Sequence, residues 1–163
     1  MSKFYQILSL PYLYIRCNFF WWKADKTNLP GEHFFKFGKL VGLKLLQKFI
    51  LSPKLLLNPV SIVRFFEYDY TLRSYSAHNS RRDKILDISS PYLFGFYLAS
   101  FFEGEYNYRN PDSNDLTLVK KYSSKIKFKM QYSANSEDAT KLTFSNNSFR
   151  YIISISVIEH ING

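Results

Sequence analysis

Small and polar residues follow the apolar segments in the second half of the chain, where they could bind a nucleotide-type ligand. Asp87, Ser89 and Ser90 come at the end of the first apolar segment, and Asn110 follows the second. A turn of small residues lets a ligand approach the backbone closely. A polar group after the second strand of a parallel sheet can form a hydrogen bond with a ribose hydroxyl. These positions therefore predict a ligand site at one edge of a sheet.

The later segments continue this pattern. Asp138 and Ala139 follow the third segment, and an Asp-Ala pair there could accept a hydrogen bond from an adenine amino group. Ser156 follows the fourth segment. The other residues expected near these ends are Pro91, Arg109, Asp112, Glu137, Val157, Glu159 and His160.

Alternating strands and helices are predicted from residue 84 onward. The expected strands are residues 84–88, 105–108, 126–132 and 151–156, and the expected helices are residues 91–102 and 112–121. Pro91 suits the first turn of a helix, and the continuous apolar run at the fourth strand is typical of a buried parallel strand. This order predicts an α/β fold: a partial, Rossmann-like parallel sheet of about four strands, with ligands beyond the carboxyl ends of the strands.

Residues 1–83 have a different composition and are expected to form a basic, aromatic-rich, mainly helical N-terminal extension to the domain at residues 84–163. They hold 13 Lys and Arg against 5 Asp and Glu, whereas residues 84–163 hold 9 against 8. A helix is expected at residues 33–51. The positive charge could steer nucleic acid or an acidic membrane surface. A solvated surface explains the same charge and is the interpretation we favour.

The sequence also limits where the protein can reside and which kinds of site it can contain. Pro11 and Arg16 interrupt the aromatic N-terminal stretch, so no run of about twenty apolar residues exists. A single cysteine excludes an internal disulfide and fits a reducing, cytoplasmic location. Glu159 and His160 are adjacent, so their side chains point apart, and we expect no metal site. Neither a Ser-His-Asp arrangement nor a phosphate-binding P-loop is present.

Two motifs in this chain have counterparts in a known family. The first is Ile85-Leu-Asp-Ile-Ser-Ser-Pro91. The second begins Asp138-Ala-Thr-Lys-Leu-Thr-Phe-Ser-Asn-Asn-Ser-Phe-Arg150 and continues through the apolar residues 151–161. Over residues 84–163 the chain resembles the class I S-adenosylmethionine-dependent methyltransferases, especially the methyltransferase type 11 domains. Their motifs look like hydrophobic-Leu-Asp-hydrophobic-Gly-small-Gly and Asp-Ala-x-x-Leu-Pro-Phe-x-Asp-x-Ser-Phe-Asp.

The resemblance implies S-adenosylmethionine as cofactor and a methyl acceptor, small-molecule or otherwise, that the sequence does not identify. The implied cofactor-binding residues are Asp87, Ser89, Ser90, Asn110, Asp138, Ala139 and Ser156. The first three would line the methionine end, the asparagine would meet the ribose, the Asp-Ala pair would meet the adenine, and Ser156 would floor the methyl-transfer pocket. No catalytic side chain is implied, because aligning an acceptor with the sulfonium supplies much of the effect.

The chain departs from the family pattern at four places. Ser89 and Pro91 replace glycines, Asn110 replaces an acid after the second strand, and Arg150 replaces the acid after Phe149. Family members continue for three more strands, so we expect a shortened member or a fragment. The last strand should then expose an apolar edge that promotes self-association. The alternatives are a non-catalytic, methyltransferase-like binding or scaffold module and a basic peripheral membrane or nucleic-acid binder.

Overall fold

A computed structural model of the chain describes residues 11–12, 15–16, 18–19, 22, 26, 29–78 and 83–155. The chain divides into two compact units, Met1–Phe66 and Glu67–Gly163. The unit that holds the sheet thus begins at Glu67, upstream of the boundary expected between residues 83 and 84.

The helices described before the sheet are α2 (Glu32–Leu46), α3 (Pro53–Leu57) and α4 (Ile62–Ser76), and α4 runs from the first unit into the second. None of the helices in the described ranges is both long enough and apolar enough to cross a bilayer. In the first unit α2 packs on α3, where a Cβ on Gly42 would lie 3.1 Å from the Leu55 side chain.

Helix α2 ends at Leu46, before the expected end at residue 51. The amide of Ile50 donates to the carbonyl of Leu45 and that of Phe49 donates to Leu46, both at 2.9 Å. Phe49 has a φ of 59° and is 98% exposed. This is a Schellman cap, which ends a helix with one residue in the left-handed region. The apolar character of Phe49 and Ile50 had suggested a continued helical face.

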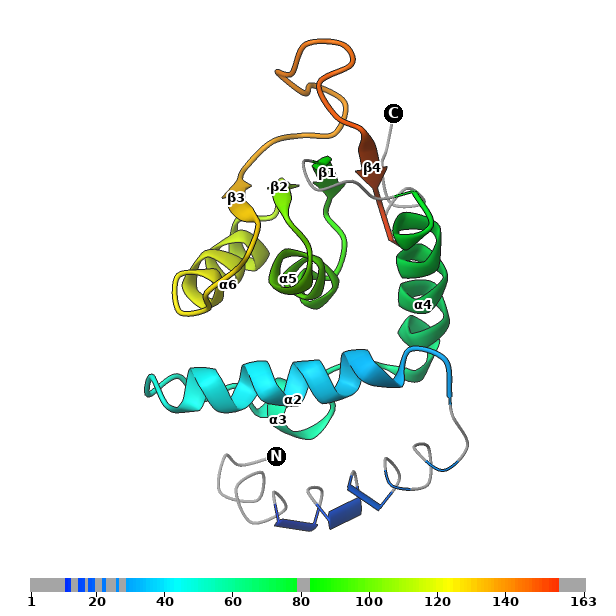
Figure 1. Cartoon of the computed structure of the whole chain (residues 1–163). Helices are drawn as coiled ribbons and strands as arrows, with labels where there is room; N and C mark the ends of the chain where they lie inside the picture. Colours follow the sequence, from blue (N-terminus) through cyan, green and yellow to red (C-terminus); the bar gives the residue numbers. More distant parts are fainter. Residues whose placement is uncertain are drawn as a thin grey trace. The chain divides into compact units, whose positions relative to one another are not determined.

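The second unit contains a four-stranded parallel sheet with the order β3-β2-β1-β4. Its elements are β1 (Asp83–Ile88), α5 (Tyr92–Phe101), β2 (Gly104–Arg109), α6 (Ser113–Ser123), β3 (Gln131–Asn135) and β4 (Tyr151–Ile153). Figure 1 shows α5 and α6 side by side against the sheet. The α/β, Rossmann-like parallel sheet expected from the sequence is confirmed, with helices preceding it.

The register puts two different surfaces on the two faces of the sheet. Ile85, Tyr106 and Tyr132 are cross-strand partners and therefore share a face. Helix α5 packs on this face, since a Cβ on Gly95 would lie 2.7 Å from the Tyr106 hydroxyl. The opposite face is mixed, because it carries the ion pair of Lys84 with Glu105 at 3.1 Å and also the buried side chain of Leu86. The aromatic core of this unit thus lies between the sheet and its helices.

The third strand begins later in the chain than the sequence pattern predicts. The alternation of apolar residues predicted a strand over residues 126–132, but β3 covers Gln131–Asn135. Ile126 and Met130 are buried, and Phe128 packs on Phe96 of α5 with ring centroids 5.3 Å apart. The amides of Lys129 and Met130 both donate to the carbonyl of Ala99. The apolar residues before β3 therefore pack the α6–β3 connection against α5 and do not extend the strand.

Strand β4 lies at one edge of the described sheet, as expected. Ile152 is 67% exposed there. The guanidinium of Arg150 and the hydroxyl of Tyr151 both donate to the carbonyl of His78, so the chain after α4 contacts the start of this strand. Self-association through the edge stays a prediction, which light scattering at tens of micromolar can test.

Candidate functional site

The chain changes direction across the sheet after β3. Strands β2 and β3 add on one side of β1, and β4 then adds on the other. In open parallel sheets this reversal leaves a crevice at the carboxyl ends of the two strands where it occurs, and ligands bind there. The carboxyl ends of β1 and β4 are therefore the place to look for a site. Figure 1 shows the connection from β3 to β4 on the side of the sheet away from α5 and α6.

The turn after β1 keeps a conformation that suits glycine. Ser89 follows the strand directly and has a φ of 55°. Its amide donates to the carbonyl of Arg109 at 2.8 Å, and its hydroxyl donates to the same oxygen at 3.3 Å. A non-glycine residue in the left-handed region is held there at a cost of about 1–2 kcal/mol. The turn between β1 and α5 thus keeps a glycine-type backbone although a serine occupies the position.

Asp87 is completely buried, and both of its carboxylate oxygens accept hydrogen bonds from within the protein. The amide of Ser90 donates to Oδ1 at 3.0 Å, and the hydroxyl of Tyr106 donates to Oδ2. Burial raises the pKa of Asp87 to about 6, although these hydrogen bonds partly oppose the shift. The carboxylate therefore links the turn after β1 to the neighbouring strand β2 by hydrogen bonds within the core.

Ser90 joins the two strands at the reversal. Its hydroxyl oxygen accepts a hydrogen bond from the amide of Ile155 at 3.0 Å, and both residues are buried. Close by, the hydroxyl of Ser154 donates to the carbonyl of Ile88 at 3.3 Å. The chain beyond β4 is therefore fastened to the chain beyond β1 by side-chain hydrogen bonds where the ladder of Tyr151–Ile153 has ended.

The amide of Asn110 is used to start α6. It is buried, its Nδ2 donates to the Tyr108 hydroxyl at 2.9 Å, and its Oδ1 accepts from the amide of Asp112 at 2.9 Å. Asp112 in turn caps the helix by accepting from the amides of Asn114 and Asp115. Each of these groups retains some unused capacity, because an amide nitrogen has two hydrogens and an amide oxygen two lone pairs.

The loop between β3 and β4 holds the Asp-Ala pair. Asp138 is exposed, and its Oδ1 accepts from both the amide and the hydroxyl of Thr140 at 2.8 Å. These bonds lower the pKa of Asp138, so it is ionised at neutral pH. The structure gives no hydrogen bond to Oδ2 among the described residues, and Ala139 is half-buried. Ser156, Glu159 and His160 lie outside the described residues.

An ion pair that sequence reasoning missed anchors this loop. Arg109 Nε donates to Glu137 Oε2 at 2.8 Å, and the two side chains are only 8% and 13% exposed. The Arg109 guanidinium also lies 4.8 Å from the centre of the Phe144 ring. Hydrogen bonds from the Thr143 hydroxyl and amide, and then the charge of Arg109, lower the pKa of Glu137. The partners are 28 residues apart, and no local pattern signals such a pair.

The structure thus gathers most of the predicted residues at one edge of the sheet. Asp87, Ser89 and Ser90 form one hydrogen-bonded turn, and Ser89 links it to the end of β2, next to Asn110. Within the described ranges, His, Cys, Asp and Glu form no cluster of three or more that could hold a metal ion. Comparison with protein-family models, curated proteins and solved structures finds no match for this chain.

Proposed function

We propose that the second unit is a methyltransferase-type domain that binds S-adenosylmethionine at the carboxyl ends of β1 and β4 and serves methyl transfer to a small-molecule acceptor. The observation that carries the proposal is the φ of 55° at Ser89, directly after β1 of a parallel sheet with the order β3-β2-β1-β4. The first methyltransferase motif has a glycine at this place. A serine held in a glycine conformation is what a diverged copy of that turn would contain.

The residues at this edge fit the cofactor in part. Asp138 keeps Oδ2 for the exocyclic amino group of an adenine, and its ionised state suits a hydrogen-bond acceptor. The remaining hydrogen on Asn110 Nδ2 suits a ribose hydroxyl. Asp87 does not fit a direct contact, because it is buried and bonded within the core. We assign it to holding the turn that would face the methionine end.

The cofactor, when bound, supplies a methyl group on a sulfonium that is already electrophilic. The chain then has to hold the nucleoside and keep the turn after β1 in place. Asp87 and Ser90 keep the turn in place, because they bond it to β2 and to the chain after β4. The Arg109–Glu137 pair helps to hold the nucleoside indirectly, because it fixes the loop that contains Asp138.

One observation favours a second candidate, a methyltransferase-like scaffold module that binds no cofactor. The polar side chains of Asp87, Ser90 and Asn110 are all buried and all hydrogen-bonded to other parts of the protein. In this alternative the same network only stabilises the sheet, and the edge has no ligand.

Calorimetric titration with S-adenosylmethionine separates the two candidates. We expect saturable binding, weakened roughly tenfold by Asp138→Ala, because a charge-assisted hydrogen bond to the adenine is lost. Asp115→Ala is the matched control, since this aspartate is also exposed but lies on α6. Absence of heat at millimolar cofactor with the unchanged chain would reject the methyltransferase proposal and leave the scaffold module. Equal loss in both variants would reject the assignment of Asp138.

A further inference from the structure

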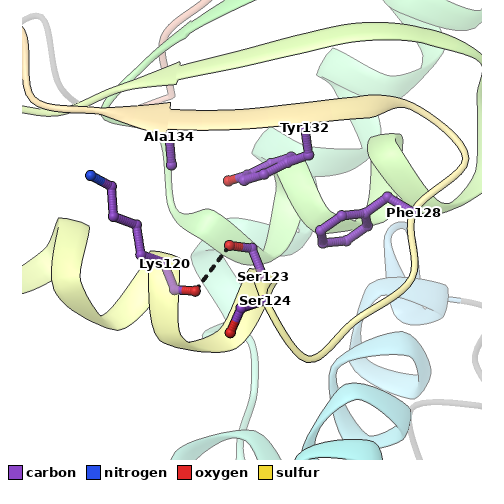
Figure 2. A pocket seen from close by; sticks show the side chains of 6 residues that line it. All are labelled: Lys120, Ser123, Ser124, Phe128, Tyr132 and Ala134. Carbon is purple, nitrogen blue, oxygen red and sulfur yellow. Dashed lines mark hydrogen bonds between the residues drawn. The ribbon is translucent and has the colours of Figure 1, made fainter.

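A cavity of about 220 Å³ lies between α6 and β3. Its lining residues are Lys120, Ser123, Ser124, Phe128, Tyr132 and Ala134, shown in Figure 2. None of them belongs to the turn after β1 or to the loop between β3 and β4. The cavity is therefore a different place from the edge that the proposed cofactor would occupy.

The hydroxyl of Tyr132 is the unusual group in this cavity. Its oxygen is buried and has no hydrogen-bond partner among the described residues. Leaving a buried hydroxyl without a partner is unfavourable, so such a group calls for an explanation. In Figure 2 the phenol oxygen points into the space beside Lys120 and Ser123. Burial raises the pKa of Tyr132 well above its ordinary value, so the group stays protonated and can donate.

Aromatic rings form one wall of the cavity. The ring of Phe128 lies beside that of Tyr132, with centroids 4.9 Å apart and planes tilted by 34°. Phe96 of α5 contacts the Tyr132 ring edge to face, with centroids 5.6 Å apart. These neighbours hold the Tyr132 ring in place, so its hydroxyl cannot easily turn to another partner. A planar, apolar ligand surface would pack well against Phe128.

The remaining polar groups favour an anion. The hydroxyl of Ser123 donates to the carbonyl of Lys120 at 3.2 Å, and that of Ser124 donates to the carbonyl of Lys121 at 3.0 Å. The last carbonyls of α6 are thus hydrogen-bonded, which offsets the negative end of the helix. Among the described side chains that line the cavity, the hydrogens left for a ligand are those of the Lys120 ammonium and the Tyr132 hydroxyl. Two donors, one of them cationic, match a carboxylate.

We propose that the cavity between α6 and β3 binds a small aromatic carboxylate, with its carboxylate between Lys120 and Tyr132 and its ring against Phe128. The size agrees with a single ring, because pockets for drug-sized ligands measure roughly 300–1,000 Å³. This inference goes beyond the proposed methyl-transfer function and does not depend on it.

Titration of the full chain with benzoate, followed by amide chemical shifts, tests the proposal. We expect saturable shifts at the lining residues with a dissociation constant of about 1 mM, as befits a ligand of few atoms. Benzamide, which has the same shape but no charge, should bind at least about tenfold more weakly. Equal binding of the two compounds, or no saturable shift with benzoate, would overturn the proposal.

Three variants separate this site from non-specific binding. Tyr132→Phe removes only the hydroxyl, and Lys120→Gln removes the charge while keeping most of the stem. Each should weaken benzoate binding roughly tenfold. Lys121→Gln is the matched control, because this exposed lysine is next on α6 but does not line the cavity, and it should bind as the unchanged chain does. If Lys120→Gln and Lys121→Gln bind equally well, Lys120 is not an anchor and the proposal fails.

Discussion

The carboxyl edge of the sheet and the cavity between α6 and β3 both contain buried polar side chains, and they use them in opposite ways. At the edge, Asp87 and Ser90 make all their polar contacts within the protein. In the cavity, the Tyr132 hydroxyl is buried and has no partner in the described part of the chain. The first arrangement is satisfied within the fold, whereas the second leaves a donor for the carboxylate that we propose. The contrast shows that polar groups already bonded within the protein and a group available for binding lie in different parts of one unit.

Replacing Asp87 by alanine should produce the largest loss of stability at the edge. The change leaves the Tyr106 hydroxyl and the Ser90 amide buried without an acceptor. We expect the free energy of unfolding to fall by about 3 kcal/mol, measured by urea denaturation. Lys84→Ala, on the same strand but exposed, is the control and should change it by less than about 1 kcal/mol. A similar effect in both variants would contradict a structural role for the carboxylate.

The pH dependence of stability tests the same carboxylate through the proton that it binds. Because the pKa of Asp87 is raised to about 6, the folded state binds its proton more tightly than the unfolded chain does. Its contribution to stability is therefore greatest below pH 4 and is lost as the pH rises through 6. We expect the difference in unfolding free energy between the unchanged chain and Asp87→Asn to shift by about 2 kcal/mol from pH 4 to pH 7.

Taking this difference cancels the opposite effect of Glu137 and Asp138, whose lowered pKa values favour folding at higher pH. A difference that does not change with pH would mean that the carboxylate is solvated, and would contradict the contrast between the edge and the cavity.

Two hydroxyl deletions compare the regions directly. Ser90→Ala leaves the buried amide of Ile155 without its acceptor, so we expect a loss of about 1–2 kcal/mol. Tyr132→Phe removes a hydroxyl for which the described residues offer no partner, so thermal unfolding should occur at the same temperature or higher. If Tyr132→Phe proves the more destabilising, the phenol has a structural partner and the comparison is wrong.

The smallest effect is expected at Ser89. Replacement by glycine relieves the left-handed strain but increases the entropy of the unfolded chain, which leaves a net gain below about 1 kcal/mol. Ser89→Val should instead lose more than about 1 kcal/mol, because a β-branched residue fits this region poorly. Denaturant unfolding of both variants measures these changes. Equal stabilities would indicate that the turn relaxes to another conformation, which would remove the observation on which the proposed function depends.

Much of the second unit is predictable from the sequence, because its strands and helices are separate blocks with clear periodicity. The ends of α5 and β1 each lie within about one residue of the expected positions. The start of β3 is not predictable in this way, because Phe128 and Met130 alternate as strand residues do while packing beneath α5. Periodicity reports which side chains are buried, and a connection can bury the same side chains as a strand.

The sequence predicts where the residues of the candidate site lie along the chain, but it does not predict which groups they contact. The sequence places Asn110 and Asp87 near strand ends, but only the fold shows that their polar atoms are bonded within the protein. The same limit applies to the cavity. The sequence presents Tyr132 as an ordinary strand residue. That its hydroxyl has no partner among the described residues depends on how α6 and Phe128 pack around it.

The short ladder of β4 has a consequence for how the unit assembles. Strands β1, β2 and β3 follow one another along the chain, with α5 and α6 between them, whereas β4 pairs with β1 across about 66 residues through only three residue pairs. Contacts between distant parts of a chain form late, since closing a long loop costs entropy before any pairing is gained. The edge where β4 docks should therefore be the last part to fold and the first to open. Its amides should exchange with solvent deuterium faster than those of β1 and β2.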